Sequence, residues 1–111
     1  MTKGISKTFS ATVETTIDLT EQHVQETPHV FIGIKFIVAG VVVTPTAGTF
    51  SITARVRGMD NFESIPSGDT IDATAALKSL NFAGNADELK YTPAGIVGAD
   101  EVQIVVTGNF A

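Results

Sequence analysis

Few side chains in this sequence could act as a catalytic base or a metal ligand. The chain has no cysteine, which excludes a thiolate nucleophile, a disulfide framework and a cysteine-based metal site. Its two histidines, His23 and His29, flank the polar stretch before Pro28, and their spacing matches no helix or strand arrangement that would aim both at one metal. We expect both histidines to be exposed to solvent and to have no catalytic or metal-binding role.

Neighbouring carboxylates are the other candidates for acid/base chemistry, because glycoside hydrolysis uses two acids across a cleft. The pairs are Asp69 with Asp72, Asp87 with Glu88, and Asp100 with Glu101. All of them lie in or next to predicted loops, where acids are ordinarily solvated, and so short a chain has little room for a substrate cleft. No catalytic residue is predicted, and the chain is not expected to be an enzyme.

Calcium is the better hypothesis for Asp60, Asp69 and Asp72, because oxygen atoms from loops are its usual ligands. The spacing of an EF-hand is missing, however, and we predict no metal site. The segment Gly95–Gly98 is too short to cradle a phosphate, and no G-x-S-x-G nucleophile motif occurs. No cofactor is therefore expected.

Length and composition indicate one folded domain spanning residues 1–111. The chain is 43% hydrophobic and only 17% charged, with a net charge of −5, which makes nucleic-acid binding a poor hypothesis. The longest nearly apolar stretch, residues 30–43, contains Lys35 and is too short to cross a bilayer. The first residues show no signal-peptide pattern.

Apolar residues alternate with polar ones along two clear strands. Between Thr49 and Arg57 one face holds Phe50, Ile52, Ala54 and Val56. The second strand alternates Val102, Ile104 and Val106 with polar residues, and Val105 is the one break in its polar face.

The remaining segments favour further short strands separated by turns. Residues 1–8 are expected to form a flexible arm, and residues 7–19 one bent strand or two short ones at an edge. Two Pro-to-Gly segments, 44–48 and 92–95, predict turns. Residues 74–80 have room for at most one short helical turn. We therefore predict an all-β fold, an antiparallel β-sandwich of the jelly-roll or immunoglobulin-like type.

The strand predicted for residues 30–38 is apolar on both faces. Val30, Ile32, Ile34, Phe36 and Val38 share one face, while Phe31 and Ile37 flank Gly33 and Lys35 on the other. A strand in a β-sandwich normally has one face packed on the core and one face exposed to solvent. The second face is therefore covered either from within, by the N-terminal arm or by residues 74–80, or by another molecule. In the second case Phe31, Lys35 and Ile37 are partner-binding residues.

Arg55 and Arg57 are the other candidate partner-binding residues. Their spacing puts both guanidinium groups on the outward face of one strand, where they could pair with carboxylates. They form either an ordinary charged sheet surface or a docking patch for an acidic partner.

A resemblance to a known class of proteins covers about half of the chain, residues 49–107. The runs that carry it are SITARVRG at 51–58, FESI at 62–65, GDTIDAT at 68–74 and YTPAGIVGADEVQIVVTG at 91–108. This region resembles small all-β virion structural proteins of tailed phages, of the capsid decoration or staple type. No functional residues can be transferred, because the resemblance lies in strand and turn patterns.

The resemblance implies a non-enzymatic protein on the capsid surface, present in many copies. Its partners would be the major capsid protein and copies of itself, with no nucleic acid and no membrane. The alternative is a receptor- or carbohydrate-binding β module, such as a tail or fibre component. The absence of tryptophan counts against sugar binding.

Overall fold

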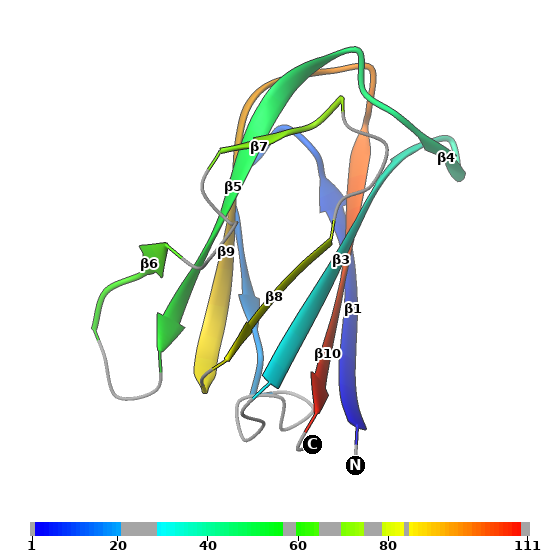
Figure 1. Cartoon of the computed structure of the whole chain (residues 1–111). Coiled ribbons are helices and arrows are strands. Elements are labelled where there is room, and N and C mark those ends of the chain that lie inside the picture. Colours follow the sequence, from blue (N-terminus) through cyan, green and yellow to red (C-terminus); the bar gives the residue numbers. More distant parts are fainter. Residues whose placement is uncertain are drawn as a thin grey trace.

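The computed structural model of the chain is a sandwich of two antiparallel β-sheets (Figure 1). It describes residues 2–20, 29–56, 60–64, 70–74, 79–83 and 85–109. Within these residues no segment is helical, and no helix could span a membrane. The predicted all-β sandwich is therefore confirmed.

Each sheet combines strands from distant parts of the sequence. Sheet A has the order β1 (Thr2–Ser10), β10 (Glu101–Asn109), β3 (His29–Val38) and β4 (Val41–Val43), and β8 (Ser79–Ala83) also pairs with β3. Sheet B has the order β2 (Thr15–Asp18), β9 (Ala86–Val97), β5 (Ala47–Val56) and β6 (Glu63–Ser64), and β7 (Ile71–Asp72) also pairs with β5.

The alternation predicted from the sequence forms the core. Phe50, Ile52 and Ala54 of β5 are buried, and so are the inward residues of β10. Each large apolar side chain removed from water in this way contributes about 1.5–3 kcal/mol to folding. On β3 the buried residues are Val30, Ile32, Ile34 and Phe36.

The N-terminal arm is the main correction to the expected fold. Residues 2–8 belong to β1, which pairs with β10 at nine consecutive positions. Ile5 is buried and Phe9 packs against the core, and these inward residues hold the strand in the sheet. Lys7 stands between them at an inward position and masks the alternation in the sequence. The prediction that residues 7–19 lie at an edge is correct, because β1 and β2 are edge strands of different sheets.

The turn predicted at residues 92–95 is also wrong, because these residues lie within β9. Ala47 pairs with Val97 and Thr49 with Ala94, so β9 has an additional residue in a bulge opposite Gly48. Gly95 has a φ of 67°, which the bulge requires and which glycine adopts readily. The two similar Pro-to-Gly segments thus lie side by side, and Thr46 N donates to Val97 O at 2.9 Å.

Several expectations fall partly outside the described residues. The helical turn at 74–80 includes residues 75–78, which are not described, whereas Leu80 is buried in β8. In the segment that follows β5, Phe62 is half-buried, and Ile65 is outside the described residues.

Four aromatic rings join the two sheets through the core. Phe36 of sheet A packs edge-on against Phe50 of sheet B, with ring centroids 5.7 Å apart. Phe50 packs against Tyr91 at 5.6 Å, and Tyr91 packs against Phe9 of sheet A, also at 5.6 Å. The two edge-to-face pairs, Phe36 with Phe50 and Phe9 with Tyr91, add about 0.5–1.5 kcal/mol each beyond the area that they bury.

The hydroxyl group of Tyr91 ties the start of the chain to this aromatic group. It donates a buried hydrogen bond of 2.7 Å to the carbonyl oxygen of Ala11. Ala11 is buried where the chain leaves β1 for sheet B, and its N–H donates to Asp100 O at 3.1 Å. Both polar groups of the Ala11 backbone are therefore satisfied without water.

We predict that Tyr91→Phe keeps the fold but destabilises it by about 1–3 kcal/mol, because the buried Ala11 carbonyl loses its donor. Urea unfolding followed by circular dichroism measures the change. Thr92→Ala is the matched control, since Thr92 makes only a long exposed contact of 3.5 Å to Glu14, and we expect it to be nearly neutral. Equal stability of Tyr91→Phe and the wild type would contradict this role.

A second prediction concerns alkaline pH. Burial raises the pKa of Tyr91 from its ordinary value of 10.0 to about 12. The unfolded chain therefore loses its phenolic proton first, and the contribution to stability that is complete below pH 10.0 is lost as the pH rises towards about 12. Tyr91 is the single tyrosine, so near-ultraviolet phenolate absorbance reports on it alone. A folded-state midpoint near 10 would show that the phenol is not buried.

A third prediction concerns Gly48, whose φ is 111°. A Cβ atom there would lie 2.6 Å from the carbonyl oxygen of Gly95, which is backbone and cannot rotate away. Gly48→Ala should therefore destabilise the protein by at least about 1–3 kcal/mol. In Gly33→Ala the new Cβ meets nothing within 4 Å, so this control should retain wild-type stability in the same urea titration. Similar unfolding midpoints for the two variants would refute the close approach at Gly48.

Candidate functional site

The outer face of sheet B is polar and its charges are paired within the chain. Arg55 stands opposite Glu88 in the β5–β9 pairing, and its Nε donates to Glu88 Oε1 at 2.8 Å. Its NH1 lies 3.4 Å from Asp87 Oδ2. The acid pair Asp87 and Glu88 thus neutralises a guanidinium group, and Arg55 does not extend freely towards a partner.

Two further charges on sheet B also have partners within the chain. The ammonium group of Lys90 lies 4.3 Å from the centroid of the Phe62 ring, in a cation–π contact. The pKa of Asp18 is lowered, chiefly because the Thr20 hydroxyl and then the Thr20 N–H donate to its carboxylate. This face is therefore solvated and satisfied by its own residues.

The outer face of sheet A is different in kind. The residues that alternate outward on β3 are Phe31, Gly33, Lys35 and Ile37. Val105 of β10 stands opposite Gly33, and Val42 of β4 stands opposite Ile37. We call these six residues the β3 face. Phe31 is 50% exposed and Val42 is 63% exposed, so large apolar side chains here contact water.

Gly33 leaves one position of the β3 face without a side chain. Its pairing partner Val105 is half-buried, and a Cβ atom on Gly33 would meet no atom within 4 Å. The β3 face therefore presents an aromatic side chain at Phe31 and a cation at Lys35, with a glycine between them. Such a surface can receive a protruding apolar side chain from another protein.

The structure brings three of the five predicted partner-binding residues together. Phe31, Lys35 and Ile37 lie in one row on β3, as the alternation predicts. Arg55 lies on the other sheet, and Arg57 is outside the described residues.

Neither internal cover considered for the β3 face is found among the described residues. β1 lies beside β10 in the same sheet and not over β3, and Leu80 belongs to β8, which pairs with the edge of β3. The second apolar side of β3 therefore remains open in the described part of the chain.

Sequence reasoning did not assign Val42 and Val105 to this surface. Val105 is visible in the sequence as the break in the polar face of its strand, but only the β3–β10 register places it next to Gly33. Val42 is brought to Ile37 by a tight turn in which Ala39 and Gly40 both have positive φ, at 50° and 81°. A turn with two such residues closes a two-residue hairpin.

The side chains considered for acid/base or metal chemistry do not converge. Asp72 accepts hydrogen bonds from the Thr74 N–H and hydroxyl, whereas His29, Asp60, Asp100 and Glu101 are exposed. His23 and Asp69 lie outside the described residues. Among the residues that are described, no three His, Asp or Glu side chains are grouped so that they could hold a metal ion.

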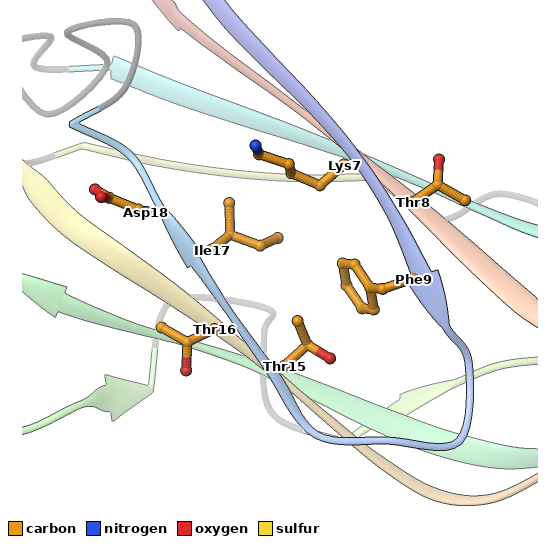
Figure 2. A pocket seen from close by; sticks show the side chains of 7 residues that line it. All are labelled: Lys7, Thr8, Phe9, Thr15, Thr16, Ile17 and Asp18. Atoms are coloured by element: carbon orange, nitrogen blue, oxygen red, sulfur yellow. The ribbon is translucent and has the colours of Figure 1, made fainter.

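A cavity of about 320 Å³ opens at the side of the sandwich, between β1 and β2 (Figure 2). Its lining is Lys7, Thr8, Phe9, Thr15, Thr16, Ile17 and Asp18. The lining residues include one lysine, one aspartate and no histidine, and Thr8 and Thr16 lie at exposed outward positions of their strands. We interpret it as the gap where edge strands of two sheets meet, with Phe9 and Ile17 as its apolar floor.

The solved structures to which the chain is similar include the following two. One is the SPBc2 prophage-derived protein YomS, with 8% identity over 95% of each chain and a TM-score of 0.48. The other is described as Bacillus endospore appendages that form a family of disulfide-linked pili, with 12% identity over 100% of this chain and 88% of that one, and a TM-score of 0.49.

The comparison with curated proteins gives no match. One family matches the sequence over its whole length, residues 1–111. The chain belongs to this family, which is described as Domain of unknown function (DUF7265).

Proposed function

We propose that the chain is a non-enzymatic structural protein of a phage virion, which binds the major capsid protein through the β3 face and reinforces the capsid from its surface. The observation that carries this proposal is the contrast between the two outer faces. Sheet B pairs its charges internally, whereas sheet A exposes Phe31 and Val42 beside few charges.

The composition of the β3 face supports protein binding. Exposed contiguous apolar surface costs solubility and is uncommon on monomers unless a partner covers it. Lys35 supplies one positive charge at the centre of the face, which favours a partner surface with a carboxylate near an apolar residue. The resemblance of residues 49–107 to small virion proteins points to a capsid as that partner.

Many weak contacts can stabilise a shell in this way. Any protein that binds the closed shell and not its separated subunits shifts the equilibrium towards the closed form. A rigid β-sandwich suits this role, because its docking face is preorganised and little conformational entropy is lost on binding.

The test is co-sedimentation with shells assembled from the major capsid protein that the same genome encodes. We expect the wild-type chain to sediment with the shells. Gly33→Glu should lower the affinity at least about tenfold, because it places a charge in the middle of the β3 face. Its fold should be unchanged, since a Cβ at residue 33 meets nothing within 4 Å.

The matched control is Thr16→Glu, which adds the same charge at an exposed position on sheet B and should bind as the wild type does. Equal binding by wild type and Gly33→Glu would exclude the β3 face. Failure of the wild type to sediment with shells would contradict the proposed function. In that case binding to a glycan array would favour the alternative, a receptor- or carbohydrate-binding module.

A further inference from the structure

One edge of the sandwich differs from all the other edges in the described part of the chain. The edge strands β2, β4, β6, β7 and β8 have 4, 3, 2, 2 and 5 residues. β1 has nine residues, pairs with β10 on one side, and has no strand on its other side among the described residues. Short edge strands are a common protection against unwanted pairing, and β1 lacks it.

Two other usual protections of an edge, a proline and a bulge, are missing from β1 as well. Residues 2–10 contain no proline, and their pairing with β10 runs through nine positions without a register shift, so no bulge bends the strand away. Lys7 points inward, but Figure 2 shows its side chain extending towards Asp18 of β2 across the side cavity. The lysine charge also contributes to the lowered pKa of Asp18.

We propose that β1 is a dimerisation strand, in which the β1 strands of two copies pair antiparallel about a twofold axis at Ser6 and join both A sheets into one continuous sheet. The inference rests on the fold alone and not on the assignment to a virion. We assign a second copy of the chain to this edge, because in one register the full length of β1 can pair with itself and no lysine directly faces another lysine.

The register follows from the positions of the lysines. When Ser6 stands opposite Ser6, all nine residues overlap, and positions 3 and 7 stand opposite Phe9 and Ile5 of the second copy. A shift of two residues in either direction places lysine opposite lysine, which is unfavourable for directly facing residues. A shift of one residue sets inward positions against outward ones. The register with the most overlap is thus also a register in which no lysine stands directly opposite another lysine.

The side chains on the outer face of the proposed β1–β1 pairing are also compatible with dimerisation. Gly4, Ser6, Thr8 and Ser10 are exposed and alternate outward, so the pairs across the axis are small and polar. A full antiparallel pairing of this length makes about eight to ten backbone hydrogen bonds. Because both β3 faces then lie on the same side of one sheet, the dimer presents two docking faces together, and bivalent binding strengthens attachment.

Sedimentation equilibrium of Ser6 variants tests this arrangement, over concentrations from about 1 μM to about 1 mM. We expect the wild type to show a monomer–dimer equilibrium. Ser6→Lys and Ser6→Asp each place like charges on the axis and should each weaken dimerisation at least about tenfold. An equimolar mixture of the two should form heterodimers, because the facing charges are then opposite.

The control variants are Thr16→Lys and Thr16→Asp, at an exposed position of the short edge strand β2, which should dimerise as the wild type does. Circular dichroism confirms that each variant is folded. Ser6 contributes only an exposed hydrogen bond, accepted from Gln103 Nε2 at 3.0 Å, so the substitutions should leave the fold intact.

A single-cysteine experiment gives a second readout. The chain has no cysteine, so Ser6→Cys introduces one thiol on the proposed axis, whereas Thr16→Cys places it away from the joint. Under mild oxidation we expect the disulfide dimer of Ser6→Cys to form at least about ten times faster than that of Thr16→Cys, because directly opposite Cβ atoms in such a pair are close enough to bridge.

Two results would overturn the proposal. They are a wild-type monomer at every concentration and a wild-type dimer that Ser6→Lys leaves unchanged. In the second case, disruption of the dimer by Gly33→Glu would assign self-association to the β3 face. Loss of capsid binding with intact dimerisation would contradict the proposed function alone, so the two failures are distinguishable.

Discussion

The contact between the two sheets through Phe36, Phe50, Tyr91 and Phe9 is the constraint on which the rest of the structure depends. These rings come from four strands, and they cross the core from sheet A to sheet B and back. The Tyr91 hydroxyl group also fixes the Ala11 carbonyl where the chain changes sheets. Because this point is fixed, β1 must remain in sheet A and β2 in sheet B, and the two become neighbouring edges of the sandwich.

A sandwich with one core has two outer faces, and in this protein they are not equivalent. The cross-strand pair of Arg55 with Glu88 and the contact of Lys90 with Phe62 are made within the chain, so these charges of sheet B already have partners. Phe31 and Val42 have no comparable cover in the described residues. The long, regular edge at β1 lies in the same sheet as this apolar face. Sheet A therefore combines the two surfaces that we propose for association.

The sequence predicts the interior of the fold well and its edges poorly. The alternation around Phe50 and Ile104 is regular, because each apolar side chain faces a core with no competing requirement. Lys7 breaks the alternation of β1, so this strand resembles a flexible arm until its pairing with β10 is known. At residues 92–95 the proline and glycine lie in a strand with a β-bulge. The same residue types are also common in turns, so the sequence alone does not distinguish the two. In the candidate site, the row of Phe31, Lys35 and Ile37 can be predicted from the alternation along one strand. The places of Val42 and Val105 in the β3 face can be predicted only when the pairing of the strands is known. The ion pairs of Arg55 join residues that are distant in the sequence, so the sequence alone does not predict them.

Hydroxyl-radical footprinting of the chain, free and bound to capsid shells, measures the central claim most directly, because it reports the solvent exposure of individual side chains. The account predicts that binding protects Phe31, Ile37 and Val42 and leaves Phe62 and Lys90 as reactive as in the free chain. Protection of Phe62 and Lys90 with unchanged reactivity at Phe31 would contradict it, because the partner would then bind the face whose charges are already paired.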